Sequence, residues 1–413
     1  MLNLDKMMQK IHKKFDWIIF SLLIILMTMG VIAIFSASTS KIGADFQTEN
    51  FWFKQIIWIL ISLSALFIVL RLPLPIIDLL IIPGYVITVF LLVLVLFLPE
   101  IKGSHRWISF GSFSFQPSET AKLLAILLAA KLLAKPHLSD WQIILRTLSV
   151  TVLPVILIFA EPDLGMAVSL IIGIFTILLI SDLPNFYLLL LLSPLFSVIT
   201  ASYIPIFILF FLLLIFVLYK TKLSYILISF TAVINIFVFF ITPVIWNNLK
   251  EYQQNRILTF IDPLRDPFGA GYQIIQSKIA IGSGGFYGKG FLEGTQKNLN
   301  FLPENHTDFI FSVIGEEFGF FGCAIILLLF FLFLFRISVS LKKLKRKERK
   351  FATMGILTYL SFQIFVNIGM NTGIVPTTGI PLPFISYGGS NLLVNVLAVA
   401  LILKFLMERS VFE

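Results

Sequence analysis

The fold class of this chain is decided by one stretch, PENHTDFIFSVIGEEFGFFGCAIILLLFFLFLF, residues 303–335. A polar segment ends there at Asp308, and an apolar run long enough to cross a bilayer begins at once. Upstream lies a polar island, residues 247–308, which holds 8 of the 24 glycines together with scattered charged side chains. An ionisable group at such a border is costly to hold in place. Asp308 is therefore the first candidate for chemistry.

The composition is that of a membrane protein. Of the 413 residues, 58% are hydrophobic and only 13% are charged, which excludes a soluble globular protein of this length. The first apolar run follows a basic segment and is longer than the apolar core of a signal peptide, so we expect it to remain as a span. Apolar runs of nearly 20 residues predict twelve spans, at about 17–36, 51–70, 76–98, 117–135, 142–160, 164–181, 185–200, 203–219, 223–246, 309–335, 351–370 and 390–407.

We therefore predict an all-α polytopic membrane protein with about 10–12 transmembrane helices in a single domain, 1–413. The short pair of runs that meet around residues 200–203 leaves one alternative open, a single broken or tilted element.

The basic residues favour one orientation in the membrane. With both termini inside, 20 of the 31 Lys and Arg fall in inner segments and 10 in outer segments, while Lys122 lies within a span. This bias follows the positive-inside rule and predicts that residues 247–308 form an extracytoplasmic loop. The eight basic residues from Arg336 to Lys350 then face the inner membrane surface. Nucleic-acid binding by this cluster is the less favoured alternative.

Several function classes are disfavoured by motifs that the sequence lacks. It has no Gly-x-x-x-x-Gly-Lys-Ser/Thr loop and no inner segment long enough for a nucleotide-binding domain, which argues against an ATP-driven pump. The four His are scattered and Cys323 is the single cysteine, so we expect neither a zinc site nor a disulfide. An enzyme acting on the outer face would need a donor that carries its own leaving group and arrives through the membrane. A polyprenyl-pyrophosphate-linked sugar meets both conditions.

Two outward-facing clusters precede the island. In the first, residues 102–122, Glu119 and Lys122 are three residues apart on one helical face, so each can offset the other's charge inside the membrane. A structural ion pair would explain them equally well. In the second, residues 161–165, Asp163 belongs to a plain outer turn or points inward to meet Lys122 or Arg106. The sequence alone leaves both alternatives open.

The island itself is the third cluster. Its interleaved apolar residues predict an ordered loop that lies along the membrane. Asp308 could simply be a helix N-terminal residue favoured by the helix dipole. The span that follows, however, carries Glu316 and Glu317 roughly 12 Å deeper at about 1.5 Å per residue, which predicts a polar cavity where a carboxylate can act as general base for a sugar hydroxyl. A close-packing helix face is predicted at Gly315, Gly319 and Gly322.

The fourth cluster, residues 367–390, carries three Pro and five Gly at membrane depth. It predicts a broken or re-entrant segment, which is tolerated there only when it is buried in protein or lines a cavity.

Taken together, these clusters resemble the SEDS family (shape, elongation, division and sporulation) of bacterial membrane proteins, from the first span to the last. The version of the last motif at residues 378–383 is similar to the elongation branch rather than the division branch. The resemblance rests on Arg106-Trp107, Gln116-Pro117-Ser118-Glu119 with Lys122, Pro162-Asp163-Leu164-Gly165, Asp266-Pro267 through Gly290, His306 through Phe311, Glu316-Glu317 and Pro376 through Ser390.

The resemblance implies a peptidoglycan glycosyltransferase that polymerises lipid II on the outer face of the bacterial cytoplasmic membrane. Asp308 matches the essential Asp of the family, the proposed base on the acceptor 4-hydroxyl. The expected substrate-binding residues are Arg106, Trp107, Glu119, Lys122, Asp163, Arg256, Lys278, His306 and Ser386. A divalent cation, Mg or Mn, is expected at the substrate pyrophosphate. The implied partners are a class B penicillin-binding protein and other elongation-complex membrane proteins.

Two departures from the family pattern bear on these expectations. The family usually has ten spans, so the run at 185–219 is predicted to be an inserted helical hairpin. Ser104-His105 precede Arg106 where the family often has Ala-Lys or Ala-Gln, which leaves the contacts of the first loop open. The competing functions are a lipid II flippase that performs no chemistry and a noncatalytic scaffold.

Overall fold

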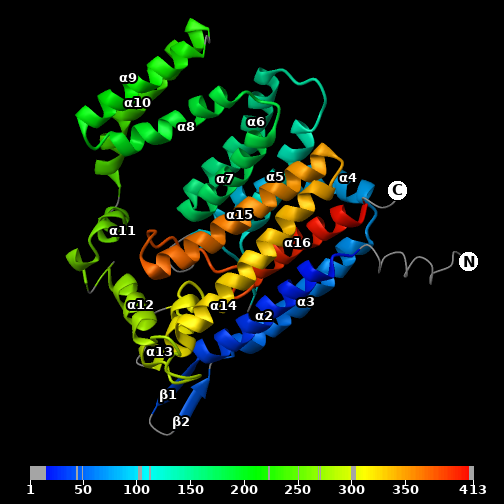
Figure 1. The fold of residues 1–413 in the computed structure, drawn as a ribbon, viewed down its shortest axis with the longest axis vertical. Helices are drawn as coiled ribbons and strands as arrows, with labels where there is room; N and C mark the ends of the chain where they lie inside the picture. The colour runs from blue at the N-terminus through cyan, green and yellow to red at the C-terminus, as the bar shows by residue number, and fades with distance from the viewer. Residues whose placement is uncertain are drawn as a thin grey trace, which may run out of the picture.

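The computed structural model describes residues 15–42, 45–48, 50–100, 105–110, 113–221, 224–249, 251–267, 269, 271–298 and 304–408. It confirms the predicted all-α polytopic membrane fold (Figure 1). The long helices are α2 (Trp17–Ala37), α3 (Phe51–Arg71), α4 (Leu74–Val95), α5 (Pro117–Leu133), α6 (Asp140–Ala160), α7 (Leu164–Ile180), α8 (Asn185–Thr200), α9 (Ile204–Lys220), α10 (Tyr225–Asn248), α14 (Ile310–Ser340), α15 (Lys347–Thr372) and α16 (Gly389–Glu408). Within the described residues, eight helices are long and apolar enough to cross a membrane, and α7, α8 and α9 are shorter apolar helices.

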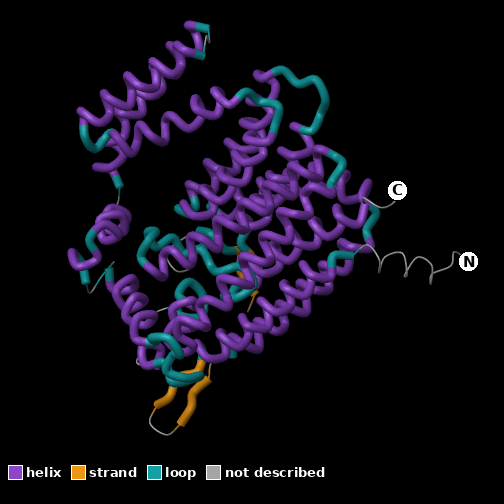
Figure 2. Tube along the Cα trace, viewed as in Figure 1, coloured by secondary structure: helices purple, strands orange, loops and turns teal. Residues whose placement is uncertain are grey.

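Within the described residues, the polar island folds into short helices. These are α11 (Glu251–Ile261), the 3-10 helix η1 (Pro263–Arg265), α12 (Tyr272–Ser283) and α13 (Thr295–Asn298). A further 3-10 helix, η2 (Leu341–Lys343), follows α14. Two antiparallel hairpins were not predicted from the sequence: β1 (Thr39–Ile42) pairs with β2 (Asp45–Thr48), and β3 (Ile108–Phe110) pairs with β4 (Phe113–Phe115). Figure 2 shows how little strand the fold contains.

The two ends of the helix bundle differ in character. The start of α2 and the end of α16 lie at one end, and α12, α13 and the β1–β2 hairpin lie at the other (Figure 1). Ion pairs join helices at the first end, where Arg336 contacts Asp16 at 2.8 Å and Arg349 contacts Asp78 at 2.6 Å. Helices α12 and α13 of the island therefore lie opposite the termini, in agreement with the nine spans, an odd number, that are predicted to precede the island. That this end faces outward remains a prediction.

The core of the bundle is built around α5, α15 and α16. Helix α15 packs on α5 and α7, α16 packs on α3, and α14 packs on α2. Where α7 crosses α15, a Cβ on Gly173 would lie 2.7 Å from the Ile126 side chain and 3.3 Å from the Gly355 carbonyl. Glycine is needed at this crossing because small residues let membrane helices approach closely.

Helices α8, α9 and α10 pack on one another and stand apart from the main bundle (Figure 1). Residues 185–219 form two helices that pack together rather than one broken element. A buried amide joins α10 to α8, since Asn235 Nδ2 donates to Ser193 Oγ at 2.9 Å and Ser197 Oγ donates to Asn235 Oδ1 at 2.6 Å. Such bonds hold helices together in an apolar environment. That this hairpin is an insertion remains a prediction.

Helix α14 is not the continuous span that the sequence predicted. At Gly319 the backbone adopts φ +63° and interrupts the helix. A Cβ there would lie 2.7 Å from the Phe286 carbonyl oxygen, and Gly315 packs on Ile281. The predicted glycine face therefore packs in part against the island, and Gly319 also breaks the helix.

Candidate active site

Asp308 lies at the junction of the island and α14, one residue before the N-cap residue Phe309. Its side chain is half-buried. Its backbone carbonyl accepts hydrogen bonds from two amides of α15, Asn367 Nδ2 at 3.0 Å and Asn371 Nδ2 at 2.9 Å. Asn371 Oδ1 in turn accepts from the backbone N–H of Ser312 at 3.2 Å. The main chain that carries the carboxylate is therefore fixed from α15.

The segment between α15 and α16 borders Asp308. Residues 373–388 form no helix, which confirms the predicted broken segment. At Gly379, where φ is +72°, a Cβ would lie 3.6 Å from Asp308 Oδ2. The next residue, Ile380, is held by a hydrogen bond of 2.8 Å from Asn367 Nδ2 to its carbonyl oxygen. One Asn thus fixes both Asp308 and the bare glycine backbone beside it.

His306 and Ser386 join the island to this segment. The His306 ring stacks on Phe51 with centroids 4.2 Å apart, and its carbonyl accepts from the Tyr387 N–H at 2.9 Å. Ser386 is buried, and its Oγ donates to the Thr307 carbonyl at 2.6 Å. Both residues lie beside Asp308, in places where they position the chain around it.

A second polar cluster lies within the bundle. The predicted ion pair is confirmed, because Lys122 Nζ lies 2.8 Å from Glu119 Oε2 and both side chains are fully buried. Lys122 Nζ also lies 4.5 Å from the centroid of the Tyr359 ring, and Asn391 Nδ2 donates to Glu119 Oε1 at 2.5 Å. A buried ion pair needs such additional partners to offset the loss of hydration.

Asp163 points inward, which decides between the two alternatives left by the sequence. Only 5% of it is exposed. Its carboxylate accepts from Gln116 Nε2 at 2.8 Å and caps α7 by accepting from the Met166 N–H at 3.2 Å. Burial raises the pKa of Asp163, although the charge of Arg106 and the bond from Met166 oppose the shift.

Arg106 and Glu161 form the outer edge of this cluster. Arg106 Nε donates to the Glu161 carbonyl at 2.9 Å, and the guanidinium also contacts the Pro162 carbonyl. Trp107 lies half-buried next to it. The Glu161 side chain is fully buried, and neither carboxyl oxygen has a hydrogen-bond partner among the described residues. Burial, with a smaller contribution from Asp163, raises the pKa of Glu161 to about 9 against the opposing effect of Arg106.

The two clusters meet at the broken segment. A Cβ on Gly165, at the start of α7, would lie 2.8 Å from the Ile380 side chain and 3.5 Å from Thr378 Cβ. The start of α7 therefore contacts residues 378–380, and Gly379 in the same segment borders Asp308. Asp163 and Asp308 come from distant parts of the sequence and lie on either side of this short segment.

Arg256 and Lys278 are the two basic residues of the island that were predicted to bind substrate, and the structure describes the side chain of only one of them. Arg256 belongs to α11, but its side chain lies outside the described residues. Lys278 is exposed on α12, and a Cβ on Gly373 would lie 2.5 Å from its Nζ. Helix α12 is held at this place by Ser277, whose Oγ donates to the Asn371 carbonyl at 2.6 Å. Lys278 thus lies at the end of α15, close to the Asn pair that fixes Asp308.

With this geometry, the chain can be compared with known proteins. Its sequence matches the family model FTSW_RODA_SPOVE, described as cell cycle protein, over residues 16–209 and 204–411. The chain belongs to this family. The predicted SEDS membership is thereby confirmed, because FtsW and RodA are the division and elongation members that the resemblance implied.

Relatives of the FTSW_RODA_SPOVE family come from both branches. The "Probable peptidoglycan glycosyltransferase FtsW" of Buchnera aphidicola subsp. Schizaphis graminum is 32% identical over 388 residues, 92% of this chain and 97% of that protein. The "Peptidoglycan glycosyltransferase MrdB" of Escherichia coli K12 is 36% identical over 335 residues, 80% of this chain and 78% of that protein.

Solved structures share the fold. A chain of a peptidoglycan synthase complex, studied for the structural coordination of polymerization and crosslinking, matches with a TM-score of 0.71 and 30% identity, covering 96% of this chain and 98% of that chain. The rod shape determining protein RodA of Thermus thermophilus matches with a TM-score of 0.63 and 24% identity over the same shares, which supports the fold alone.

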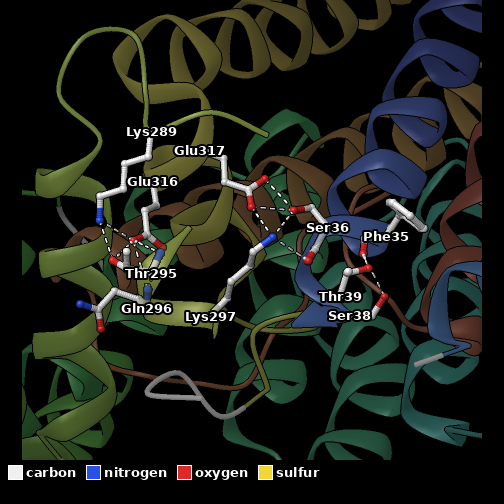
Figure 3. A network of polar contacts seen from close by, with 10 residues as sticks. All are labelled: Phe35, Ser36, Ser38, Thr39, Lys289, Thr295, Gln296, Lys297, Glu316 and Glu317. Atoms are coloured by element: carbon white, nitrogen blue, oxygen red, sulfur yellow. Dashed lines mark hydrogen bonds and ion pairs between the residues drawn. The ribbon is translucent and has the colours of Figure 1, made fainter. Parts of the chain in front are cut away.

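The sequence predicted a polar cavity bordered by α14, which carries Glu316 and Glu317. In the structure these two carboxylates form buried ion pairs instead. Both are buried, and lysines from the island contact them, Lys289 at 2.7 Å from Glu316 and Lys297 in an ion pair with Glu317 (Figure 3). No spacing in the sequence indicated these pairs. For Asn367 and Asn371 a signal existed, two amides at i, i+4 spacing on one membrane helix, which places them on one face.

Metal ligands are scarce in the described part of the chain. Within it, no group of three or more His, Cys, Asp or Glu side chains is arranged to hold a metal ion. The divalent cation expected at the substrate pyrophosphate remains a prediction.

Proposed function

We propose that this chain is a peptidoglycan glycosyltransferase that polymerises lipid II during cell elongation, with Asp308 as its general base. The activity follows from family membership and from relatives of both branches that carry this name. The elongation role is supported by the similarity to MrdB. The assignment of the base rests on one observation, the half-buried carboxylate of Asp308 beside the glycine backbone of residue 379.

The reaction requires a base at the acceptor sugar. Asp308 would take the proton of the acceptor 4-hydroxyl while that oxygen attacks the anomeric carbon of the donor. The bond from this carbon to the pyrophosphate breaks with inversion, and the electron pair leaves with undecaprenyl pyrophosphate. Gly379 leaves space for the sugar because a Cβ there would lie 3.6 Å from Asp308 Oδ2. The amides of α15 hold the main chain of the base still during the transfer.

The leaving group needs positive charge. Lys278 is an exposed cation at the end of α15, while Arg106 donates to two backbone carbonyls and Lys122 is buried against Glu119. We propose that Lys278 contacts the pyrophosphate and that Lys122 acts through its cluster. A divalent cation, if used, would be bound mainly by pyrophosphate oxygens and would neutralise their charge.

We also propose an orientation and a partner. The excess of basic residues at the end with the termini supports a cytoplasmic location for that end, in the bacterial inner membrane. The similarity to a chain of a complex that combines polymerization with crosslinking supports a class B penicillin-binding protein as partner.

The test is polymerisation by purified protein. Wild type with its partner is given lipid II in detergent, and the products are resolved by size. We expect glycan strands from wild type and none from Asp308→Asn. The matched control is Glu251→Gln, an exposed carboxylate of the same island, which should polymerise normally. Folding is checked by gel filtration and by partner binding.

The result also separates the enzyme from a flippase. Polymer from Asp308→Asn at the wild-type rate would exclude this residue as base. Transport would be favoured by a different pair of results. Wild type with its partner would make no polymer in detergent, and the same protein in vesicles would move lipid II across the membrane.

A further inference from the structure

The loop at residues 284–298, here called the glycine loop, folds back onto the broken turn of α14. The break at Gly319 exposes backbone groups that a continuous helix would use internally. Backbone hydrogen bonds across the break run from Lys289 N to Glu316 O (3.0 Å), Gly290 N to Glu317 O (3.0 Å), Phe320 N to Gly285 O (2.9 Å) and Phe321 N to Phe286 O (3.2 Å). Backbone groups of the glycine loop therefore satisfy the N–H and carbonyl groups that the break in α14 leaves without helical partners.

Two neighbouring carboxylates anchor the end of this loop, and they differ in the number of their partners. Glu316 accepts from Thr295 N at 2.8 Å, from Thr295 Oγ1 at 2.9 Å and from Gln296 N at 3.1 Å. It also pairs with Lys289 at 2.7 Å, a side chain that is partly exposed. Glu316 would therefore keep three hydrogen bonds without that lysine.

Glu317 depends on fewer groups, all of them buried. Lys297 forms its ion pair, and Ser36 Oγ donates to it at 2.6 Å. Lys297 Nζ also donates to Ser36 Oγ at 2.6 Å and to the Ser36 carbonyl at 3.0 Å, which ties α13 to the end of α2 (Figure 3). Burial lowers the pKa of Lys297, and the nearby Glu317 opposes that shift. Removal of one charge would leave the other buried with little compensation.

This ion pair joins two helices that flank the proposed base in the sequence. Lys297 of α13 precedes Asp308 by 11 residues, and Glu317 of α14 follows it by 9. We propose that Lys297 is a positioning residue, which through Glu317 and Ser36 holds α13 and the first part of α14 against α2 and so sets the place of the Asp308 carboxylate beside Gly379. This inference rests on the proposed function.

The test compares Lys297→Met with Lys289→Met, a matched loss of one lysine from the same loop. We expect Lys297→Met to lower kcat for lipid II polymerisation by about tenfold or more with little change in KM, because a displacement of about 1 Å can cost 10²-fold. Lys289→Met should stay within about threefold of wild type. The double variant Lys297→Met/Glu317→Gln removes both buried charges and should recover folding and part of kcat. A folded Lys297→Met protein with wild-type kcat would overturn the proposal.

A second readout does not depend on activity. Hydrogen exchange of the backbone amides of Lys289, Gly290, Phe320 and Phe321 should be about tenfold faster in Lys297→Met and nearly unchanged in Lys289→Met. Equal exchange rates of these amides in wild type, Lys297→Met and Lys289→Met would overturn the proposal that Lys297 holds these segments together. If wild type itself made no polymer, the glycosyltransferase assignment would fail. Faster amide exchange confined to Lys297→Met would still support the positioning role of Lys297.

Discussion

The carboxyl group of Glu161 offers the sharpest test of the electrostatics in the turn between α6 and α7. It is fully buried in the turn between α6 and α7 and has no hydrogen-bond partner among the described residues. Arg106 is close, but its N–H groups donate to the carbonyls of Glu161 and Pro162. Glu161→Gln keeps the shape of the side chain and removes the ionisable proton. We expect this variant to be more stable than wild type at alkaline pH.

The magnitude follows from the two pKa values of the carboxyl group. Burial raises its pKa from the usual 4.5 to about 9 in the folded protein. Between these values the folded state binds more protons than the unfolded state, so the free energy of unfolding falls as the pH rises. This stabilisation is fully present below about pH 4.5 and is lost as the pH rises through about 9. At about 1.36 kcal/mol per pH unit, the loss is at most roughly 6 kcal/mol.

The assay is denaturant unfolding in detergent from pH 5 to pH 9, for wild type and Glu161→Gln. The free energy of unfolding of the variant minus that of wild type should be small at pH 5 and should grow steadily with pH. The control is Glu251→Gln, which removes an exposed carboxylate elsewhere on the chain, and the trend should be confined to Glu161→Gln. Parallel curves for wild type and Glu161→Gln would refute a raised pKa and the burial that explains it.

Two further substitutions test the architecture. Gly319→Ala should lower the free energy of unfolding by about 1–3 kcal/mol and reduce polymerisation, because φ is +63° and the new Cβ would lie 2.7 Å from the Phe286 carbonyl oxygen. The control Gly282→Ala should be tolerated, because no atom lies within 4 Å of its new Cβ. Thermal midpoints and product sizes measure both effects. Arg349→Met should lower the free energy of unfolding by about 3–5 kcal/mol because it removes a buried cation that pairs with Asp78, Glu348 and Glu408. The double variant with Asp78→Asn should recover part of the loss, and a midpoint as low as that of the single variant would contradict this account.

The spans could be predicted because the bilayer sets a length that composition alone reveals. The run predicted at 223–246, for example, became α10, Tyr225–Asn248. The break in α14 could not be predicted, because Gly319 within an apolar run has the appearance of a packing residue. The interruption is stabilised by backbone bonds to a loop some thirty residues earlier, and hydrophobic periodicity contains no information about such bonds.

The site shows the same division between local and distant signals. Glu119 and Lys122 could be paired from the sequence because i, i+3 spacing on a helix fixes their distance. The pair of Lys297 with Glu317 was missed because the two residues are twenty positions apart and belong to different helices, so no spacing rule applies. Asp163 was left undecided for a related reason, since its partner Gln116 comes from another helix.

Burial separates the carboxyl group that can act as base from those that cannot. Five carboxyl groups, in the buried clusters and beside the break in α14, are 5% exposed or less, namely Glu119, Glu161, Asp163, Glu316 and Glu317. Three of the five are neutralised by a lysine, and burial raises the pKa of the other two. Asp308 is half-buried and is placed beside glycine backbone. A base must reach the proton that it removes, so the helix border that first marked Asp308 in the sequence also gives it access to the acceptor, while the amides of Asn367 and Asn371 hold its main chain in place.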